Sequence, residues 1–119
     1  MDLKEQIKAA VGAHGLWKGR LKNAIDTGKA DVTVADVQSD HNCAFGKWLQ
    51  GLDASQMSCA SCKACKDLHA KFHMAAASVL ALALAGKKQE ALKALAVDSQ
   101  FGKLSVQLTN ALMAWSRTA

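Results

Sequence analysis

Two histidines, His69 and His73, stand four residues apart in a stretch of strong helix formers that contains no proline. On a helix, positions i and i+4 lie one above the other on the same face. The two imidazoles can therefore point at one place in space, as a bound metal ion requires. A histidine pair on an exposed helix surface has the same spacing, so the pair alone leaves both interpretations open.

Two other side chains, His14 and Cys43, extend the pair to a set of four candidate ligands. His14 lies within the apolar stripe of the first expected helix, so it should face the core. Three imidazole nitrogens and one thiolate suit a tetrahedral zinc ion. Four protein ligands close the coordination shell, whereas a hydrolytic zinc site keeps one position open for water. The set therefore predicts a structural or sensing site rather than a catalytic one.

Helices must position these side chains, because the sequence is rich in Ala and Leu and has no Pro or Tyr. This composition predicts an all-helical protein. The first helix is expected from about residue 2 to residue 27, since apolar residues recur there at intervals of three and four. Gly28 should end this helix. Gly12, Gly15 and Gly19 are poor helix formers, and we expect them to admit a neighbouring helix.

Residues 29–40 are expected to be a long connection with room for a turn of helix. A short helix should follow over residues 41–49, with a cap from Ser39 or Asp40 and an end at Gly51. This short helix carries the candidate cysteine ligand.

A third, long helix is expected to begin at a cap from Asp53 or Ser55, to reach about Ala85 and to stop at Gly86. A fourth helical region is expected over residues 87–117, with a break near Ser99. Its core-facing residues should be Leu104, Leu108, Leu112 and Trp115. The sequence shows no repeat or linker, so residues 1–119 are expected to form one domain.

The charge and the hydropathy of the chain narrow the classes of partner. The net charge of +5 could attract nucleic acid or anionic lipid, but the lysines are spread out without a dense basic run, so we expect no nucleic-acid site. The longest apolar run, residues 74–85, is too short to span a bilayer. No secretory signal is visible, so the four cysteines are expected to be metal ligands or redox thiols rather than disulfides.

Three sequence blocks resemble the chemoreceptor zinc-binding domain family. They are His-Gly-Leu-Trp at 14–17, Cys-Ala-Phe-Gly-Lys-Trp-Leu at 43–49 and His-Ala-Lys-Phe-His at 69–73. The family pattern is H-x-x-W, then C-x-[LF]-G-x-W, then H-x-x-x-H, and the resemblance covers nearly the whole chain. It implies a helical bundle that binds Zn²⁺ through His14, Cys43, His69 and His73. Together with the helices above, this predicts a four-helix bundle with an additional short helix carrying the cysteine ligand.

The resemblance also implies a biological setting. Members of the family are cytoplasmic bacterial sensors, usually homodimeric and usually attached to a chemoreceptor or a diguanylate cyclase, which makes cyclic-di-GMP. Their inputs include the zinc level and reactive chlorine oxidants, and the resemblance does not choose between the two. A zinc-bound thiolate such as Cys43 remains open to oxidation, which would weaken its hold on the metal and free the short helix.

The run Cys59, Cys62 and Cys65 is a departure from the family pattern. Cys65 stands one turn before His69, so it could be a spare ligand or a resolving thiol for Cys43. Small residues that pack the start of a helix have the same spacing. The run also resembles a truncated iron–sulfur ligand set, but the usual Pro is missing and a cluster would compete with zinc for His69.

Five residues are expected to pack around the site, namely Trp17, Phe45, Gly46, Trp48 and Phe72. They would exclude water and hold the ligand rotamers, although ordinary core packing explains them nearly as well. The alternative to a sensor is a structural zinc module that mediates dimerisation or docks another protein. An enzyme is not expected, because the sequence has no nucleophile–base pair, no Gly-rich phosphate loop and no acidic dyad.

Overall fold

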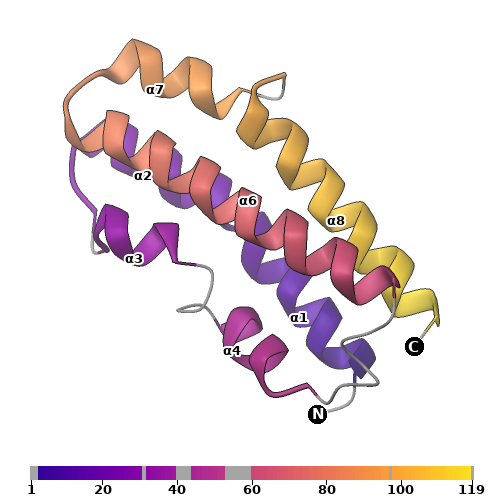
Figure 1. The fold of residues 1–119 in the computed structure, drawn as a ribbon. Coiled ribbons are helices and arrows are strands. Elements are labelled where there is room, and N and C mark those ends of the chain that lie inside the picture. The colour runs from indigo at the N-terminus through magenta and orange to yellow at the C-terminus, as the bar shows by residue number, and fades with distance from the viewer. Residues whose placement is uncertain (1–2, 31, 40–43, 53–59, 97, 119) are drawn as a thin grey trace.

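Three long arms run along an elongated body of 45 × 25 × 19 Å (Figure 1). The computed structural model describes residues 3–30, 32–39, 44–52, 60–96 and 98–118, and within these ranges every regular element is a helix. The arms are α1 (Leu3–Gly15) with α2 (Trp17–Thr27), then α6 (Ala60–Leu84), then α7 (Lys88–Leu95) with α8 (Gln100–Thr118). The all-helical prediction is confirmed for these residues, while the arrangement of four helices with one extra stays a prediction.

The helix predicted over residues 2–27 is divided at Leu16 into α1 and α2. The division is mild, because the backbone of Leu16 is near-helical, at φ −72° and ψ −18°. The amide of Leu16 donates to the carbonyl of Gly12 at 3.3 Å, and the carbonyl of Leu16 accepts from the amide of Arg20 at 3.1 Å. Two glycines near the division lower the local helix propensity. The predicted stop at Gly28 is confirmed, with a left-handed φ of 72°.

The expected role of Gly12, Gly15 and Gly19 is wrong for this chain as described. A Cβ atom built on any of the three would meet no atom of the described residues within 4 Å, leaving aside the helix itself and the adjoining residues. All three are exposed, and so is Leu16 between them. This face of α1 and α2 has low helix propensity, but among the described residues no other helix packs closely over it.

The turn of helix expected between residues 29 and 40 is α3 (Val34–Gln38). It begins with a capping box, in which the side chain of Thr33 accepts from the amide of Asp36 at 3.1 Å and the carboxylate of Asp36 accepts from the amide of Thr33 at 3.5 Å. Val37 is the buried residue of this helix. Since α3 packs against α6, it lies beside the helix that carries both histidines of the pair.

The short helix is α4 (Ala44–Gln50), and Gly51 follows it as predicted, donating its amide to the carbonyl of Trp48 at 3.0 Å. Ser39, one of the two predicted caps of this helix, instead ends α3, where its amide donates to the carbonyl of Ala35. Three other predicted cap positions lie outside the described residues, namely Asp40, Asp53 and Ser55.

The two remaining predicted boundaries are confirmed. Gly86 takes a left-handed φ of 78° after α6, and the amide of Lys87 reaches back to the carbonyl of Leu82 at 3.0 Å. Ser99 caps α8, since its side-chain oxygen accepts from the amide of Gly102 at 3.1 Å. A stop built on glycine and a start built on serine are local signals, which explains why the sequence alone located them.

The core lies where α6 meets α1, α2 and α8. α6 packs against α8, α2 and α3, and α1 packs against α8. The predicted stripe of α8 is buried throughout, at Leu104, Leu108, Leu112 and Trp115. Within the described part of the chain, no helix combines the length and the apolar character that a membrane span needs.

Candidate metal centre

Three histidines from two arms of the molecule meet in its interior. His14 comes from α1, and His69 and His73 come from α6; their side chains are 5%, 0% and 2% exposed. One nitrogen from each ring lies within 4.8 Å of the other two. Nitrogens bound to a tetrahedral zinc ion lie about 3.4 Å apart, given a Zn–N bond of about 2.1 Å. Small rotations of the side chains would therefore bring all three nitrogens into the coordination shell of one zinc ion.

The three rings stand nearly perpendicular to one another. The centroid of His14 is 4.8 Å from that of His69 and 5.6 Å from that of His73, and the last two are 4.5 Å apart. The interplanar angles are 88°, 88° and 80°. Stacked rings would hold their nitrogens side by side, whereas perpendicular rings can direct three lone pairs to one point from different sides. The arrangement is compatible with a shared metal ion, and it is also an edge-to-face geometry that aromatic rings favour.

Two of the rings have their protonated nitrogen assigned by a backbone carbonyl. Nδ1 of His14 is 2.7 Å from the carbonyl oxygen of Ala10, and Nδ1 of His73 is 2.8 Å from that of Val37. A carbonyl oxygen only accepts, so Nδ1 carries the hydrogen and donates in both cases. In a neutral ring, Nε2 then bears the lone pair that a metal needs.

Burial holds the ring of His14 in the form that binds a metal. It lowers the pKa of His14 to about 4; the hydrogen bond to Ala10 opposes the shift, and nearby His73 adds to it. His14 is therefore neutral at pH 7, and neutral imidazole is the ligand form. Nδ1 of His69 and Nε2 of His73 are buried, and neither atom has a hydrogen-bond partner among the described residues, although both rings make other contacts. A metal ion would satisfy such nitrogens.

Two phenylalanines enclose the rings. Phe45, near the start of α4, has its ring centroid 5.0 Å from that of His69 and 5.8 Å from that of His14, edge to face in both cases. Phe72 of α6 lies 5.3 Å from His14 and 5.8 Å from His73. Both phenylalanines are buried, so they keep water away from the rings. Both rings lie beside the three histidines, and their predicted role at a bound metal stays a prediction.

The two tryptophans expected beside the site, Trp17 and Trp48, lie at different distances from the three histidines. Trp17 reaches the site, with its ring 6.4 Å from His73, and it also carries the guanidinium of Arg20 at 4.0 Å above its face. The pair of Trp17 and Arg20 was not among the predicted contacts, although its i,i+3 spacing was a usable signal. The ring centroid of Trp48 lies 5.7 Å from that of Phe45, on which it stacks, and 5.8 Å from that of Trp115. Trp48 therefore packs on the far side of Phe45 and joins α4 to α8. The predicted role of Gly46 stays a prediction.

Of the three extra cysteines, Cys62 and Cys65 lie within the described residues and Cys59 does not. Cys62 and Cys65 are completely buried on the core face of α6. Among the described residues, the group that could hold a metal consists of histidines alone, so Cys65 does not join it as the spare ligand considered above. Helix packing accounts for the burial of both residues, and their redox role stays a prediction. Cys43, Cys59 and His41 lie outside the described residues.

The carbonyl of Val37 is the site group that sequence reasoning missed entirely. Every residue offers a carbonyl, so no residue type marks this one as an acceptor for a histidine. Only the packing of α3 on α6 brings it to His73.

A helical domain with a buried histidine centre, open to one metal ion, is the class that this fold and site define. The chain belongs to the family described as the chemoreceptor zinc-binding domain, whose pattern matches residues 14–80, more than half of the chain. Comparison with curated proteins and with solved structures finds no match. The family is regulatory and sensory, its cofactor is zinc, and the three histidines form a group that could hold that ion.

Proposed function

We propose that this domain is a zinc-dependent sensor in which His14, His69, His73 and Cys43 hold the ion. The observation that carries the proposal is the convergence of three buried imidazoles within 4.8 Å. Buried imidazoles of this kind suit a tightly held zinc ion, and a thiolate would complete the tetrahedral set.

The position of Phe45 supports Cys43 as the fourth ligand. Phe45 follows Cys43 by two residues, and its ring lies 5.0 Å from that of His69. Two residues of extended chain span at most about 7 Å. The reach of the chain is therefore compatible with a cysteine ligand that enters from the start of α4.

The sulfur of Cys43 is the proposed reacting atom. Bound zinc keeps this sulfur deprotonated and therefore nucleophilic. With hypochlorous acid as oxidant, the thiolate gains a hydroxyl group and becomes sulfenic acid, while the chlorine takes the electron pair and leaves as chloride. The sulfur loses two electrons in this step. Sulfenic acid is a weaker donor than thiolate, so oxidation loosens the attachment of Cys43 while the three histidines remain.

α4 is the element that would report the change. It has seven residues and is anchored by buried Phe45 and Leu49 and by the contact of Trp48 with Trp115, so release of Cys43 would remove one of a small number of attachments. Withdrawal of zinc would free the same helix, which makes the zinc level a second input. In this proposal the domain acts as a cytoplasmic homodimer that signals to a chemoreceptor or a diguanylate cyclase, as the family membership suggests.

Oxidation is expected to increase hydrogen exchange in residues 44–50 and to leave α6 protected. Cys43→Ser should show fast exchange in residues 44–50 even when reduced. It should retain part of its zinc through the three histidines and should no longer respond to hypochlorous acid. Cys59→Ser is the matched control, since it removes a thiol outside the proposed ligand set, and it should behave as wild type. Hydrogen exchange followed by mass spectrometry measures the exchange rates before and after oxidation, and metal analysis measures the zinc that each variant retains.

Two results would redirect the proposal. If oxidation speeds exchange around residues 59–65 and leaves 44–50 unchanged, the extra cysteines are the redox site and Cys43 is a structural ligand. If neither oxidation nor zinc withdrawal alters residues 44–50, the domain is the structural zinc module, and its contribution is to dimerisation or docking.

A further inference from the structure

α3 contributes a single atom to the metal centre, and it does so from a remote part of the chain. The carbonyl oxygen of Val37 accepts the Nδ1 hydrogen of His73 at 2.8 Å, across 36 residues of sequence. Val37 is 2% exposed, and both partners of the bond are buried. The bond therefore belongs to the packing of α3 on α6 rather than to either helix alone.

This bond distinguishes His73 from His14. The ring of His14 donates to Ala10 in the preceding turn of its own helix, so α1 itself supplies the acceptor for this ring. The ring of His73 finds its acceptor only if α3 is in place. Without that carbonyl, the imidazole could exchange tautomers and rotate, and Nε2 would no longer be directed at the other two rings. Groups that hold a metal-binding histidine in this way typically affect metal affinity 10- to 100-fold.

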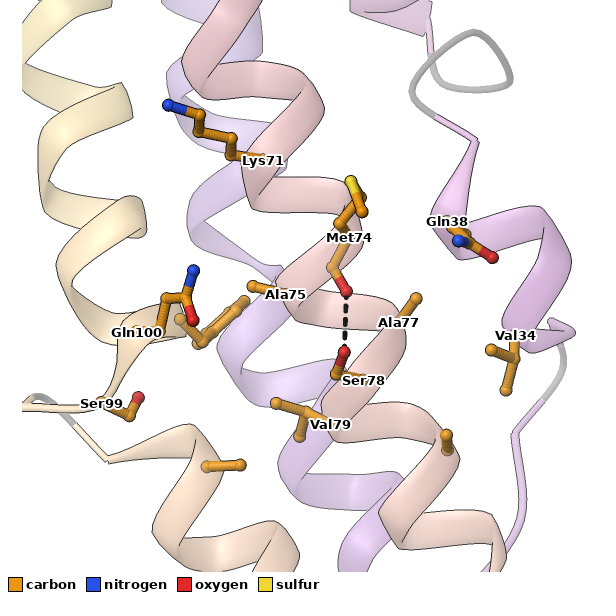
Figure 2. A pocket seen from close by; sticks show the side chains of 13 residues that line it. Val34, Gln38, Lys71, Met74, Ala75, Ala77, Ser78, Val79, Ser99 and Gln100 are labelled. Atoms are coloured by element: carbon orange, nitrogen blue, oxygen red, sulfur yellow. Dashed lines mark hydrogen bonds between the residues drawn. The ribbon is translucent and has the colours of Figure 1, made fainter.

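α3 is a fragile support. It has five residues, too few to be stable as an isolated helix in water. Its order depends on the capping box of Thr33 and Asp36, both exposed, on the burial of Val37 and on the packing of Val32 and Val34 against the core. Figure 2 shows Val34 and Gln38 facing α6 across an open groove, so solvent reaches this side of the contact between α3 and α6.

We propose that α3 is a positioning element of the zinc centre, and that the order of α3 and the affinity for zinc are coupled through the bond from His73 to Val37. This inference depends on zinc binding but not on the oxidation of Cys43. Because coupling between two sites is reciprocal, zinc must order α3 by the same factor by which an ordered α3 tightens zinc.

The double variant Thr33→Ala/Asp36→Ala removes the capping box and leaves every proposed ligand intact. We expect its dissociation constant for zinc to rise about 10-fold, measured by competition with a chelator. Its Co²⁺-loaded form should show altered d–d absorption, which a loss of stability alone would not cause. Thr33→Ser keeps the cap and should bind zinc as wild type does. Ser99→Ala removes the corresponding cap of α8, so it should lower the melting temperature without changing the affinity for zinc.

Hydrogen exchange tests the reciprocal half of the coupling. Adding zinc to wild type that has been stripped of metal with a chelator should slow exchange of residues 34–38 about 10-fold, the factor expected above. In His73→Ala this slowing should disappear, even at zinc concentrations that saturate the variant. The proposal would be overturned if the Thr33→Ala/Asp36→Ala variant bound zinc with wild-type affinity. It would also be overturned if zinc left the exchange rate of residues 34–38 unchanged. A wild type that binds no zinc would instead refute the proposed function, so the two failures can be told apart.

Discussion

Replacing His69 or His73 by Ala is expected to remove most of the zinc and to lower the melting temperature of the holoprotein by about 10 °C. The reason is that zinc binds the folded state, and at a hundredfold excess over its dissociation constant a ligand adds about 2.7 kcal/mol to stability. For a domain of 119 residues, 1 kcal/mol corresponds to about 4 °C. Metal analysis and thermal unfolding of the same samples measure the two losses together.

The control for this prediction is His41→Ala, which removes a histidine outside the proposed ligand set. It should keep its zinc and its melting temperature. A second comparison uses protein stripped with a chelator, where the gap between wild type and the ligand variants should shrink because the zinc contribution is absent from both. Full zinc content in both His69→Ala and His73→Ala would show that the ligands are misassigned.

Phe72→Ala is expected to lower the free energy of unfolding by about 3–5 kcal/mol. The side chain is completely buried, and it packs on His14 at 5.3 Å and on Phe101 at 5.2 Å. Its loss opens a cavity directly beside the metal centre. The variant should therefore also bind zinc more weakly than wild type, because the ring of His14 gains freedom to move.

Phe101→Ala separates the two effects of the Phe72 substitution. Phe101 is also a buried core aromatic, but the described structure gives it a ring contact with Phe72 and none with the three histidines. It should lose stability in the same range and keep its affinity for zinc. Should Phe72→Ala fail to fold, Phe72→Leu gives a smaller cavity in the same place. Equal zinc affinity in the Phe72 and Phe101 variants would contradict the role assigned to Phe72.

The helix ends and the histidine centre could be predicted because their signals are local or periodic. Gly28, Gly86 and Ser99 act through the backbone within one turn, so each can be recognised without the rest of the fold. The pair His69 and His73 shares a helix face by the spacing of a helix alone. These features require no knowledge of which helices pack together.

The failures concern what lies beyond a single helix. Gly12, Gly15 and Gly19 suggested a close contact with another helix. The low helix propensity of glycine does not tell which surface lies opposite it, and among the described residues no atom lies close to these positions. The contact of Val37 with His73 could not be predicted from the sequence, because Val37 acts through its backbone carbonyl and every residue has one. The division at Leu16 is a different case: it interrupts the helix at one residue while the hydrogen bonds continue on both sides, so the apolar periodicity gives no sign of it.

Metal analysis of the purified wild-type chain tests the central claim most directly. The protein should be prepared reduced, without added metal, and analysed for zinc, iron and acid-labile sulfide. The three buried imidazoles and the family to which the chain belongs predict one tightly held zinc per chain and no sulfide. Absence of zinc, or iron together with acid-labile sulfide, would contradict the account and would favour a cluster on Cys59, Cys62 and Cys65.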